Sequence, residues 1–180
     1  MNCPQCKGYS LEPKELEPGL VVAACMKCQG TMVSLMNYRF WVDQIADTTE
    51  INALNLETTQ VDDSQSAKVC PKCSKLMTKF QIGPDAVNRL DLCTGCDEAW
   101  LDKGEWGLLK QLDLADKLPK IFTDAWQRNV RLARQQKKHD SRYEALLGAD
   151  DFARVNEFKK WLDAHPEKQA IKQYLITKLD

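Results

Sequence analysis

The apolar and polar positions between residues 75 and 92 predict a β-hairpin. In the outgoing strand, every second residue is predicted to face the same side, and these residues are Leu76, Thr78, Phe80 and Ile82. The residues between them are Lys, Met or Gln. This period of two is the pattern of a strand with one buried face. Residues 83–85, Gly-Pro-Asp, predict the turn, and residues 87–92 predict the returning strand with Leu90 and Leu92 on one face.

A second hairpin is predicted near the start of the chain. Residues 11–16 predict its outgoing strand, Pro18 and Gly19 its turn, and residues 20–24 its returning strand. Pro13 has no backbone N–H to donate, so it restricts the outgoing strand to the edge of a sheet or interrupts it.

Helical spacing replaces the strand pattern after each hairpin. After the hairpin at residues 75–92, Asp102 and Glu105 fit a capping box at the start of a helix. The apolar stripe of that helix consists of Trp106, Leu109 and Leu112. After the N-terminal hairpin, Ser34 is the predicted N-cap of a helix that continues to Ile45. We expect Trp100 and Trp106 to pack in the core rather than to stack on a ligand.

The C-terminal region, residues 113–180, contains no cysteine and predicts a small unit of three helices. Pro119 can occupy the first turn of the first helix, and Gly148 is its predicted end. The apolar stripe of this helix has a period of 3.6 and consists of Ile121, Phe122, Ala125, Trp126, Val130 and Ala133.

The other two helices are predicted on either side of His165 and Pro166, which break the pattern. Asp150 is the predicted N-cap of the second helix. Its predicted inward face consists of Phe152, Val155, Phe158 and Leu162. The apolar positions of the third helix are Ile171, Tyr174, Leu175 and Leu179.

The chain has 180 residues, of which 43% are hydrophobic and 28% charged, a composition typical of a folded globular protein. Its 25 Lys and Arg nearly balance its 26 Asp and Glu, which excludes a histone-like polycation and an acidic tail protein. No apolar run approaches the roughly 18 residues of a membrane span. The first residues, Met-Asn-Cys-Pro, lack the basic and apolar regions of a signal peptide, so we expect a cytoplasmic protein.

All eight cysteines fall into four Cys-x-x-Cys pairs. The pairs are Cys3 and Cys6, Cys25 and Cys28, Cys70 and Cys73, and Cys93 and Cys96. Eighteen residues separate the first pair from the second, and nineteen separate the third from the fourth, both within the spacing typical of zinc sites. The first two pairs correspond to the last two at offsets of 67 and 68 residues, so the chain contains an internal repeat.

Two Cys-x-x-Cys turns at the ends of a hairpin can direct four thiolates at one tetrahedral ion. The repeat therefore predicts two Zn²⁺ per chain, with no coordination position left for water or substrate, so both sites are expected to be structural. Each repeat spans only about 40–45 residues, near the length below which a core alone does not support a fold. Structural zinc contributes roughly 10–16 kcal/mol to the folding of such units.

Three alternatives use the same cysteines. Disulfides need an oxidising compartment, and no export signal is present in the sequence. A thioredoxin-like redox pair uses one Cys-x-x-Cys motif in a βαβ unit, not four in register. Four thiolates also bind iron; the residues that follow the knuckles, Lys7-Gly8 and Ser74-Lys75, favour zinc.

The second repeat resembles the bacterial TFIIB-type zinc-ribbon family. The resemblance covers residues 69–112, where Cys70-Pro-Lys-Cys73 and Cys93-Thr-Gly-Cys96 flank the hairpin and Trp-Leu-Asp-Lys-Gly-Glu follows at residues 100–105. The first repeat has the same knuckles, but Met-Val-Ser at residues 32–34 replaces Trp-Leu-Asp, and it is identified as a degenerate copy. The resemblance implies a zinc ribbon like those of the transcription machinery.

Together these patterns predict a small metal-bound α+β fold, in which two tandem zinc ribbons precede a helical C-terminal region. The first ribbon with its trailing helix occupies residues 1–47, and the second occupies residues 69–112. Residues 48–68 contain four acids and one Lys, without an aromatic residue, and predict an acidic linker. Residues 113–180 form the helical region, which can pack on the ribbons.

Near-neutral charge and closed metal sites favour a non-enzymatic regulatory or adaptor module with a protein partner such as the transcription machinery. The sequence contains no nucleophile elbow, Gly-rich phosphate loop or open metal site, and no small-molecule substrate or membrane is expected.

The alternative is a regulator that binds DNA or RNA directly. Its contacts would come from the second hairpin, at Lys72, Lys75, Lys79 and Arg89, and from a basic helix face formed by Arg128, Arg131, Arg134, Lys138 and Arg142. A solvated face of a long helix explains the same charges, and the pI of about 6.2 favours that simpler interpretation.

Overall fold

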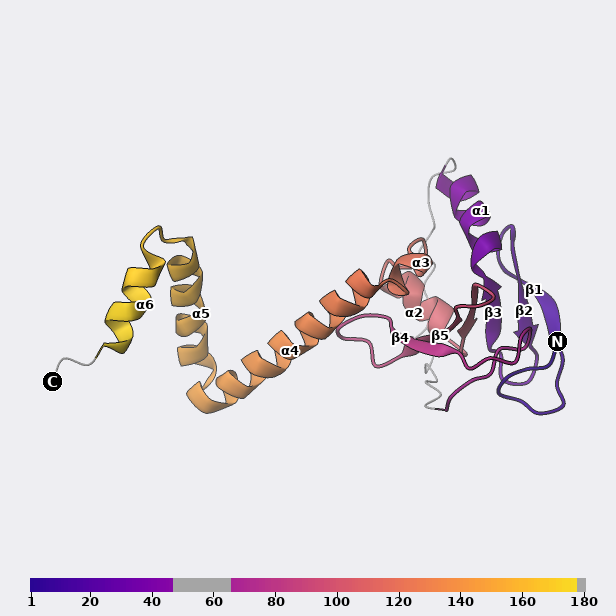
Figure 1. Cartoon of the computed structure of the whole chain (residues 1–180), viewed down its shortest axis with the longest axis horizontal. Coiled ribbons are helices and arrows are strands. Elements are labelled where there is room, and N and C mark those ends of the chain that lie inside the picture. Colours follow the sequence, from indigo (N-terminus) through magenta and orange to yellow (C-terminus); the bar gives the residue numbers. More distant parts are fainter. Residues whose placement is uncertain (47–65, 178–180) are drawn as a thin grey trace. The chain divides into compact units, whose positions relative to one another are not determined.

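The computed structural model describes residues 1–46 and 66–177 (Figure 1). They divide into two compact units, Met1–Arg131 and Leu132–Asp180. The first unit contains all the strands found among the described residues, and all eight cysteines. Most of the predicted acidic linker, up to residue 65, lies outside the described residues.

The first unit is built on one six-stranded antiparallel sheet. Its strands are β1 (Leu11–Glu17), β2 (Leu20–Cys25), β3 (Thr31–Ser34), β4 (Thr78–Gln81), β5 (Arg89–Cys93) and β6 (Glu98–Leu101). They lie in the order β1-β2-β3-β6-β5-β4. The mixed α+β class and both predicted hairpins are confirmed, and β1, which contains Pro13, is an edge strand as expected. A helix follows each hairpin as predicted, and α1 (Leu35–Ala46) begins directly after Ser34, but the sequence pattern did not predict β3 and β6, which lie between the second knuckle and the helix of each repeat.

The two repeats meet at β3 and β6, which pair with each other in the middle of the sheet. Thr31 lies opposite Leu101 and Val33 opposite Ala99, so Met32 lies opposite Trp100. These pairs are symmetric under the 68-residue offset of the repeat, with Met32 and Trp100 at equivalent positions. The two ribbons therefore form one continuous sheet around a local two-fold relationship.

One face of this sheet carries a hydrophobic core shared by both repeats. Two helices, α1 (Leu35–Ala46) and α2 (Glu105–Gln111), contribute Trp41 and Trp106, whose rings lie 6.0 Å apart. The Tyr38 hydroxyl on α1 donates to the carbonyl of Ala115 at 2.6 Å and accepts from the backbone N–H of Leu118 at 3.1 Å. The first helix is thus bound to the segment that follows the second ribbon.

The predicted capping box at the start of α2 forms only in part. The Glu105 carboxylate accepts the backbone N–H of Asp102 at 2.7 Å, as the motif requires. The Asp102 side chain does not cap α2, because it binds Lys68 and the indole N–H of Trp100, and Gly104 occupies the N-cap. Asp102 therefore forms a buried ion pair with Lys68, and the prediction that it is the N-cap is wrong.

The start of the helical region covers the free edge of β4. A short helix, α3 (Leu118–Ile121), precedes α4 (Asp124–Leu147), and Pro119 lies in the first turn of α3 as predicted. The side-chain amide of Gln127 binds both the backbone N–H and the carbonyl of Gln81, at 3.1 and 2.9 Å, in the manner of a further strand. The single helix predicted from Pro119 to Gly148 is interrupted, since the Thr123 hydroxyl accepts the N–H of Trp126 and begins α4 anew.

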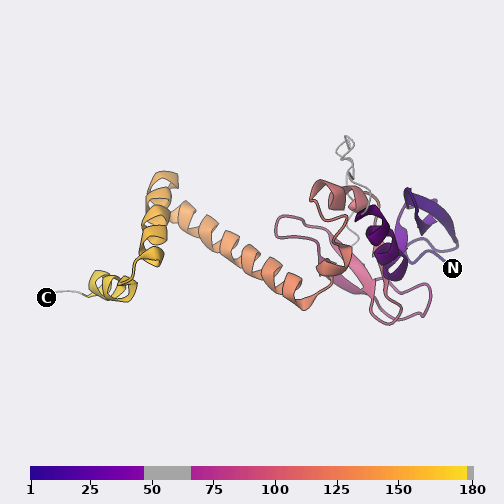
Figure 2. The same cartoon turned by 90° about the horizontal axis from the view of Figure 1, so that it is seen from above.

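The last helices are α4, drawn as one continuous rod in both views (Figures 1 and 2), α5 (Ala149–Ala164) and α6 (Lys168–Ile176). Gly148 ends α4 with a φ of 80°, and the predicted break at His165 and Pro166 is confirmed. The prediction of Asp150 as N-cap is wrong, because Gly148 occupies that position. The predicted inward face of α5 is also wrong for Val155 and Phe158, which are 49% and 43% exposed. Leu179 lies outside the described residues.

Candidate metal centre

The eight cysteines come together in two clusters of four. One cluster consists of Cys3, Cys6, Cys25 and Cys28, and the other of Cys70, Cys73, Cys93 and Cys96. Within each cluster all four sulfur atoms lie within 4.8 Å of one another, and no cysteine is in a disulfide. Each cluster can therefore hold one metal ion.

The donor set and spacing of both clusters fit zinc. Four sulfur ligands at the usual Zn–S distance of 2.3 Å place the sulfur atoms about 3.8 Å apart in a tetrahedron. The Sγ atoms of Cys3 and Cys28 are 3.6 Å apart, and those of Cys73 and Cys93 are 3.5 Å apart. An ion bound by these four thiolates would act as a cross-link between the two knuckles of each repeat.

Backbone conformation shapes each knuckle around its sulfurs. The residue directly after three of the four pairs has a positive φ, namely Gln29 at 59°, Ser74 at 58° and Asp97 at 56°. The other knuckle uses Gly8, at 80°, for the same reversal. Such turns direct backbone N–H groups at the thiolates; the N–H of Cys6 lies 3.2 Å from the sulfur of Cys3.

One thiol in each cluster has a lowered pKa and therefore loses its proton at a lower pH than an ordinary cysteine. Burial raises the pKa of Cys25, but backbone N–H groups and neighbouring thiols outweigh it and lower the pKa to about 7. The backbone N–H of Lys75 and the thiols of Cys96 and Cys93 lower the pKa of Cys73 to about 7. Sharing of its proton with Cys73 raises the pKa of Cys96 to about 12. Metal binding would therefore release protons, as thiolate ligation requires.

Both clusters lie on the same side of the sheet and share one layer of buried residues. This layer contains Met32, Met77 and Trp100 between the cysteines of the two repeats. Trp100 is fully buried, and its indole N–H donates to the carboxylate of Asp102 at 2.8 Å. The predicted core role of Trp100 and Trp106 is confirmed.

A buried ion cluster beside the second centre is not visible in the sequence pattern. The ammonium of Lys68 is 3.0 Å from a carboxylate oxygen of Asp91 and 3.0 Å from one of Asp102. Lys79 also reaches Asp91, at 2.9 Å. Burial lowers the pKa of Lys68, but its two carboxylates outweigh burial and raise it, so this ammonium stays charged. The polar Asp91 between two buried leucines, Leu90 and Leu92, is the one sequence signal of this cluster.

Of the residues of the nucleic-acid alternative, Lys72 lies inside the Cys70–Cys73 knuckle, and Lys75 lies two residues after it. Of the hairpin residues, Lys72 pairs with Glu98 and Lys79 with Asp91, so part of that positive charge is neutralised. The predicted basic helix residues all lie on α4, where Arg134 is half-buried and the others, Arg128, Arg131, Lys138 and Arg142, are exposed.

Comparisons of the chain with protein-family models, with curated proteins and with solved structures find no match. Among residues 1–46 and 66–177, no helix combines the length and apolar character needed to cross a bilayer. The resemblance to TFIIB-type ribbons rests on the motif residues, and the geometry supports two four-cysteine centres of the kind that bind zinc.

Proposed function

We propose that the protein is a zinc-dependent, non-enzymatic adaptor in which two zinc ribbons act as one rigid body. The observation that carries this proposal is the pairing of β3 with β6, which joins the repeats in one sheet. Two Zn²⁺, one per four-cysteine cluster, would hold the knuckles of that body in place. Because four sulfurs complete a tetrahedron, neither ion offers a position for substrate chemistry.

The outer face of α1 is the surface best suited to a protein partner. Met36 and Phe40 lie one turn apart on this helix and are 59% and 64% exposed. Between them, Arg39 forms an ion pair of 2.7 Å with Asp97, which follows the last knuckle of the second repeat. The backbone N–H of Leu35 also donates to the carbonyl of Asp97. A partner bound to α1 would therefore contact a surface whose position depends on both ribbons.

The resemblance to TFIIB-type ribbons makes the bacterial transcription machinery the first partner to test. The zinc-loaded chain serves as bait, with RNA polymerase as the measured prey. We expect stoichiometric capture that is lost in Phe40→Glu, which places a charge on the exposed face of α1. Phe158→Glu, which changes an exposed Phe on α5, is the matched control and should retain the partner.

Absence of stoichiometric capture of RNA polymerase, or of any other protein, would contradict the adaptor role. Equal capture by wild type and Phe40→Glu would contradict the assignment to α1. Zinc content is measured on the same preparations. A variant that keeps both zinc ions but does not capture the partner has lost the binding surface and not the fold.

Direct binding of DNA or RNA is the second candidate, and the exposed cations of α4 favour it. Arg131, Lys138 and Arg142 recur at intervals of seven and four residues, so they share one helix face. Binding through them should weaken with salt, with a logarithmic slope of about −0.9 for each phosphate neutralised on duplex DNA. The substitutions Lys138→Glu and Arg142→Glu should then lower the affinity and the slope, and lack of measurable affinity at about 50 mM salt would exclude this role.

A further inference from the structure

The two four-cysteine clusters have the same ligands and the same pattern of exposure. In each cluster, the first cysteine of both pairs is buried and the second is half-buried. The sulfur atoms of both clusters also lie within 4.8 Å of one another. Ligand chemistry and access to solvent therefore do not distinguish the two centres, so a difference between them must come from the residues around them.

A buried ion pair joins the two segments that lead into the second cluster. Lys68 lies two residues before Cys70, and Asp91 lies two residues before Cys93. The Lys68 ammonium is 3.0 Å from carboxylate oxygens of both Asp91 and Asp102, and all three side chains are at most 2% exposed. Such contacts are hard to break, because separation would leave buried charges without partners. Since none of these residues is a metal ligand, they can hold the two segments together without a bound ion.

A second ion pair joins the knuckles themselves. Lys72 lies between Cys70 and Cys73, and its ammonium pairs with the carboxylate of Glu98, two residues after Cys96. The pKa of Lys72 is raised, mainly by its hydrogen bond with Glu98 and to a smaller extent by the charges of Cys96 and Cys70. Its positive charge therefore lies close enough to stabilise the thiolates, whose combined negative charge exceeds the positive charge of Zn²⁺.

The first repeat has no charged side chain at any of these positions. The equivalent residues are Met1 for Lys68, Gln5 for Lys72, Ala23 for Asp91, Gly30 for Glu98 and Ser34 for Asp102. Strand pairing supports this alignment, because Ala23 lies opposite Met32 as Asp91 lies opposite Trp100. Neither ion pair can therefore form between the corresponding side chains of the first repeat.

A weaker contact joins the segments of the first cluster. The ammonium of Lys27 lies 4.7 Å from the centre of the Tyr9 ring. Both residues are exposed, and a cation–π contact in water is weaker than one that is shielded from it. The first cluster is therefore held less firmly in its metal-binding arrangement than the second.

We propose that the first cluster is an exchangeable zinc site and the second a permanent one, with Lys68 and Lys72 as positioning residues of the second alone. A site whose ligands are already assembled loses less freedom on binding and therefore binds more tightly. Removal of residues that support metal ligands lowers metal affinity about 10- to 100-fold, so we expect the two zinc dissociation constants to differ at least about 10-fold. This inference rests on the proposed zinc-dependent function.

The exchangeable site lies where its occupancy would affect the rest of the first unit. Cys28, the last ligand of the first cluster, lies three residues before β3, which continues directly into α1. Both clusters also pack on the layer that contains Trp100. Release of this zinc would therefore loosen the segment that leads into the proposed partner surface, so the adaptor would respond to the zinc supply.

Stepwise removal of zinc from the full chain, first saturated with zinc, tests this order. A chelator is added in increasing amounts, native mass spectrometry counts the ions per chain, and N-ethylmaleimide marks the cysteines that have lost their metal. We expect a one-zinc species modified at Cys3, Cys6, Cys25 and Cys28 and protected at the other four cysteines. Because both clusters have the same pattern of exposure, the reagent does not favour one of them.

The variant Lys72→Gln gives the second cluster the residue that the first repeat has at this position. We expect the zinc dissociation constant of the second cluster to rise about 10-fold, which narrows the difference between the two centres. Lys72→Arg keeps the ion pair with Glu98 and should retain the order of the wild type. Lys120→Gln removes an exposed lysine on α3, outside both repeats, and should also leave the order unchanged. Circular dichroism at 222 nm checks that each zinc-loaded variant is folded.

The outcomes separate this inference from the proposed function. A chain that binds no zinc contradicts both. Two ions that are released together, or a second cluster that empties first, overturn the inference and leave the zinc-dependent adaptor in place. An unchanged dissociation constant in Lys72→Gln overturns the role of Lys72.

Discussion

Gly30 and Trp100 touch so closely that position 30 has no room for a side chain. A Cβ at position 30 would overlap Cζ2 of the indole and lie 2.9 Å from Cε2 and 3.2 Å from Cη2. Gly30 directly precedes β3 and Trp100 lies within β6, so this contact joins the two repeats at their seam. Because Trp100 is fully buried, its ring has little space into which it can move.

Gly30→Ala should therefore destabilise the whole first unit. Inserting a methyl group into such a packed contact costs about 1–3 kcal/mol, and we expect about 2 kcal/mol or more in urea unfolding of the zinc-loaded protein. Gly83→Ala is the matched control, since a Cβ there meets nothing within 4 Å. Equal stability of the two variants would show that the Trp100 ring does not lie against Gly30.

Lys68→Met should destabilise the protein more than the loss of a surface ion pair. The substitution removes the buried cation between Asp91 and Asp102 and leaves only Lys79, which pairs with Asp91, to compensate two buried carboxylates, a change that costs roughly 3–5 kcal/mol. Lys117→Met removes a lysine from a partly exposed pairing with Asp113 and Asp116, so its effect should stay below about 1 kcal/mol. Similar values for both variants would contradict the buried position of Lys68.

Glu105 should make the protein less stable as the pH rises. Burial, aided by the carboxylate of Asp102, raises the pKa of Glu105 to about 8. The folded state then binds this proton more tightly than the unfolded state. The stabilisation is complete below about pH 4.5 and is lost as the pH rises through about 8. The contribution to the slope is at most about 1.4 kcal/mol per pH unit.

The variant Glu105→Gln isolates this contribution, because the amide oxygen can still accept the N–H of Asp102 without ever ionising. Unfolding free energies of zinc-loaded wild type and variant, compared between about pH 6 and 8, should differ by an amount that grows as the pH rises, with the wild type losing stability relative to the variant. Parallel profiles would contradict a protonated Glu105 in the folded protein.

Loss of one metal centre should disturb the other repeat, because the two share a sheet and a core. Cys25→Ser with Cys28→Ser removes half of the ligands of the first cluster and leaves the second intact. We expect the near-ultraviolet circular dichroism of Trp100 and Trp106, both in the second repeat, to fall in this variant. An unchanged Trp signal would mean that the repeats fold independently.

The hairpins and the cysteine clusters could be predicted from local sequence patterns, but the pairing of β3 with β6, which connects the two repeats, could not. The hairpin of β4 and β5 follows from period-two spacing and turn residues, that of β1 and β2 from the Pro18-Gly19 turn between its two strand segments, and the clusters follow from cysteine spacing. Strands β3 and β6 have only four residues each, and Ala99, Trp100 and Leu101 are all buried, so no alternation marks them. Their pairing joins residues that are 64 to 70 positions apart, which no local pattern can reveal.

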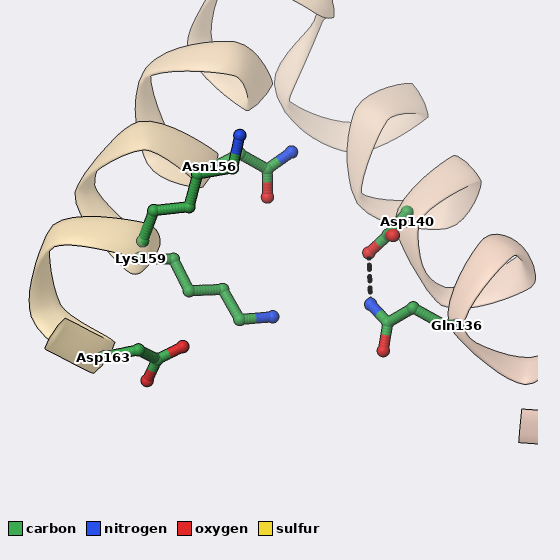
Figure 3. Close-up of a pocket in the computed structure, with 6 residues that line it drawn as sticks. Gln136, Asp140, Asn156, Lys159 and Asp163 are labelled. Carbon is green, nitrogen blue, oxygen red and sulfur yellow. Dashed lines mark hydrogen bonds between the residues drawn. The ribbon is translucent and has the colours of Figure 1, made fainter. Parts of the chain in front are cut away.

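Helix α5 shows a second limit of prediction from sequence, which concerns the packing of an amphipathic helix. Its sequence identifies an apolar side that contains Val155 and Phe158 but not what that side packs against. Sequence reasoning placed it inward, whereas the structure turns Lys159 and Asn156 toward α4 (Figure 3) and leaves Phe158 exposed. Amphipathic spacing defines a face, and only tertiary structure shows whether the same chain covers it.

Metal content of the purified, reduced protein tests the central claim most directly. Elemental analysis combined with native mass spectrometry should find two zinc ions per chain, bound by eight thiolates. Removal of both ions by a chelator should abolish the near-ultraviolet signal of Trp100 and Trp106. Fewer than two equivalents of zinc, another metal in its place, or cysteines joined in disulfides would contradict the account.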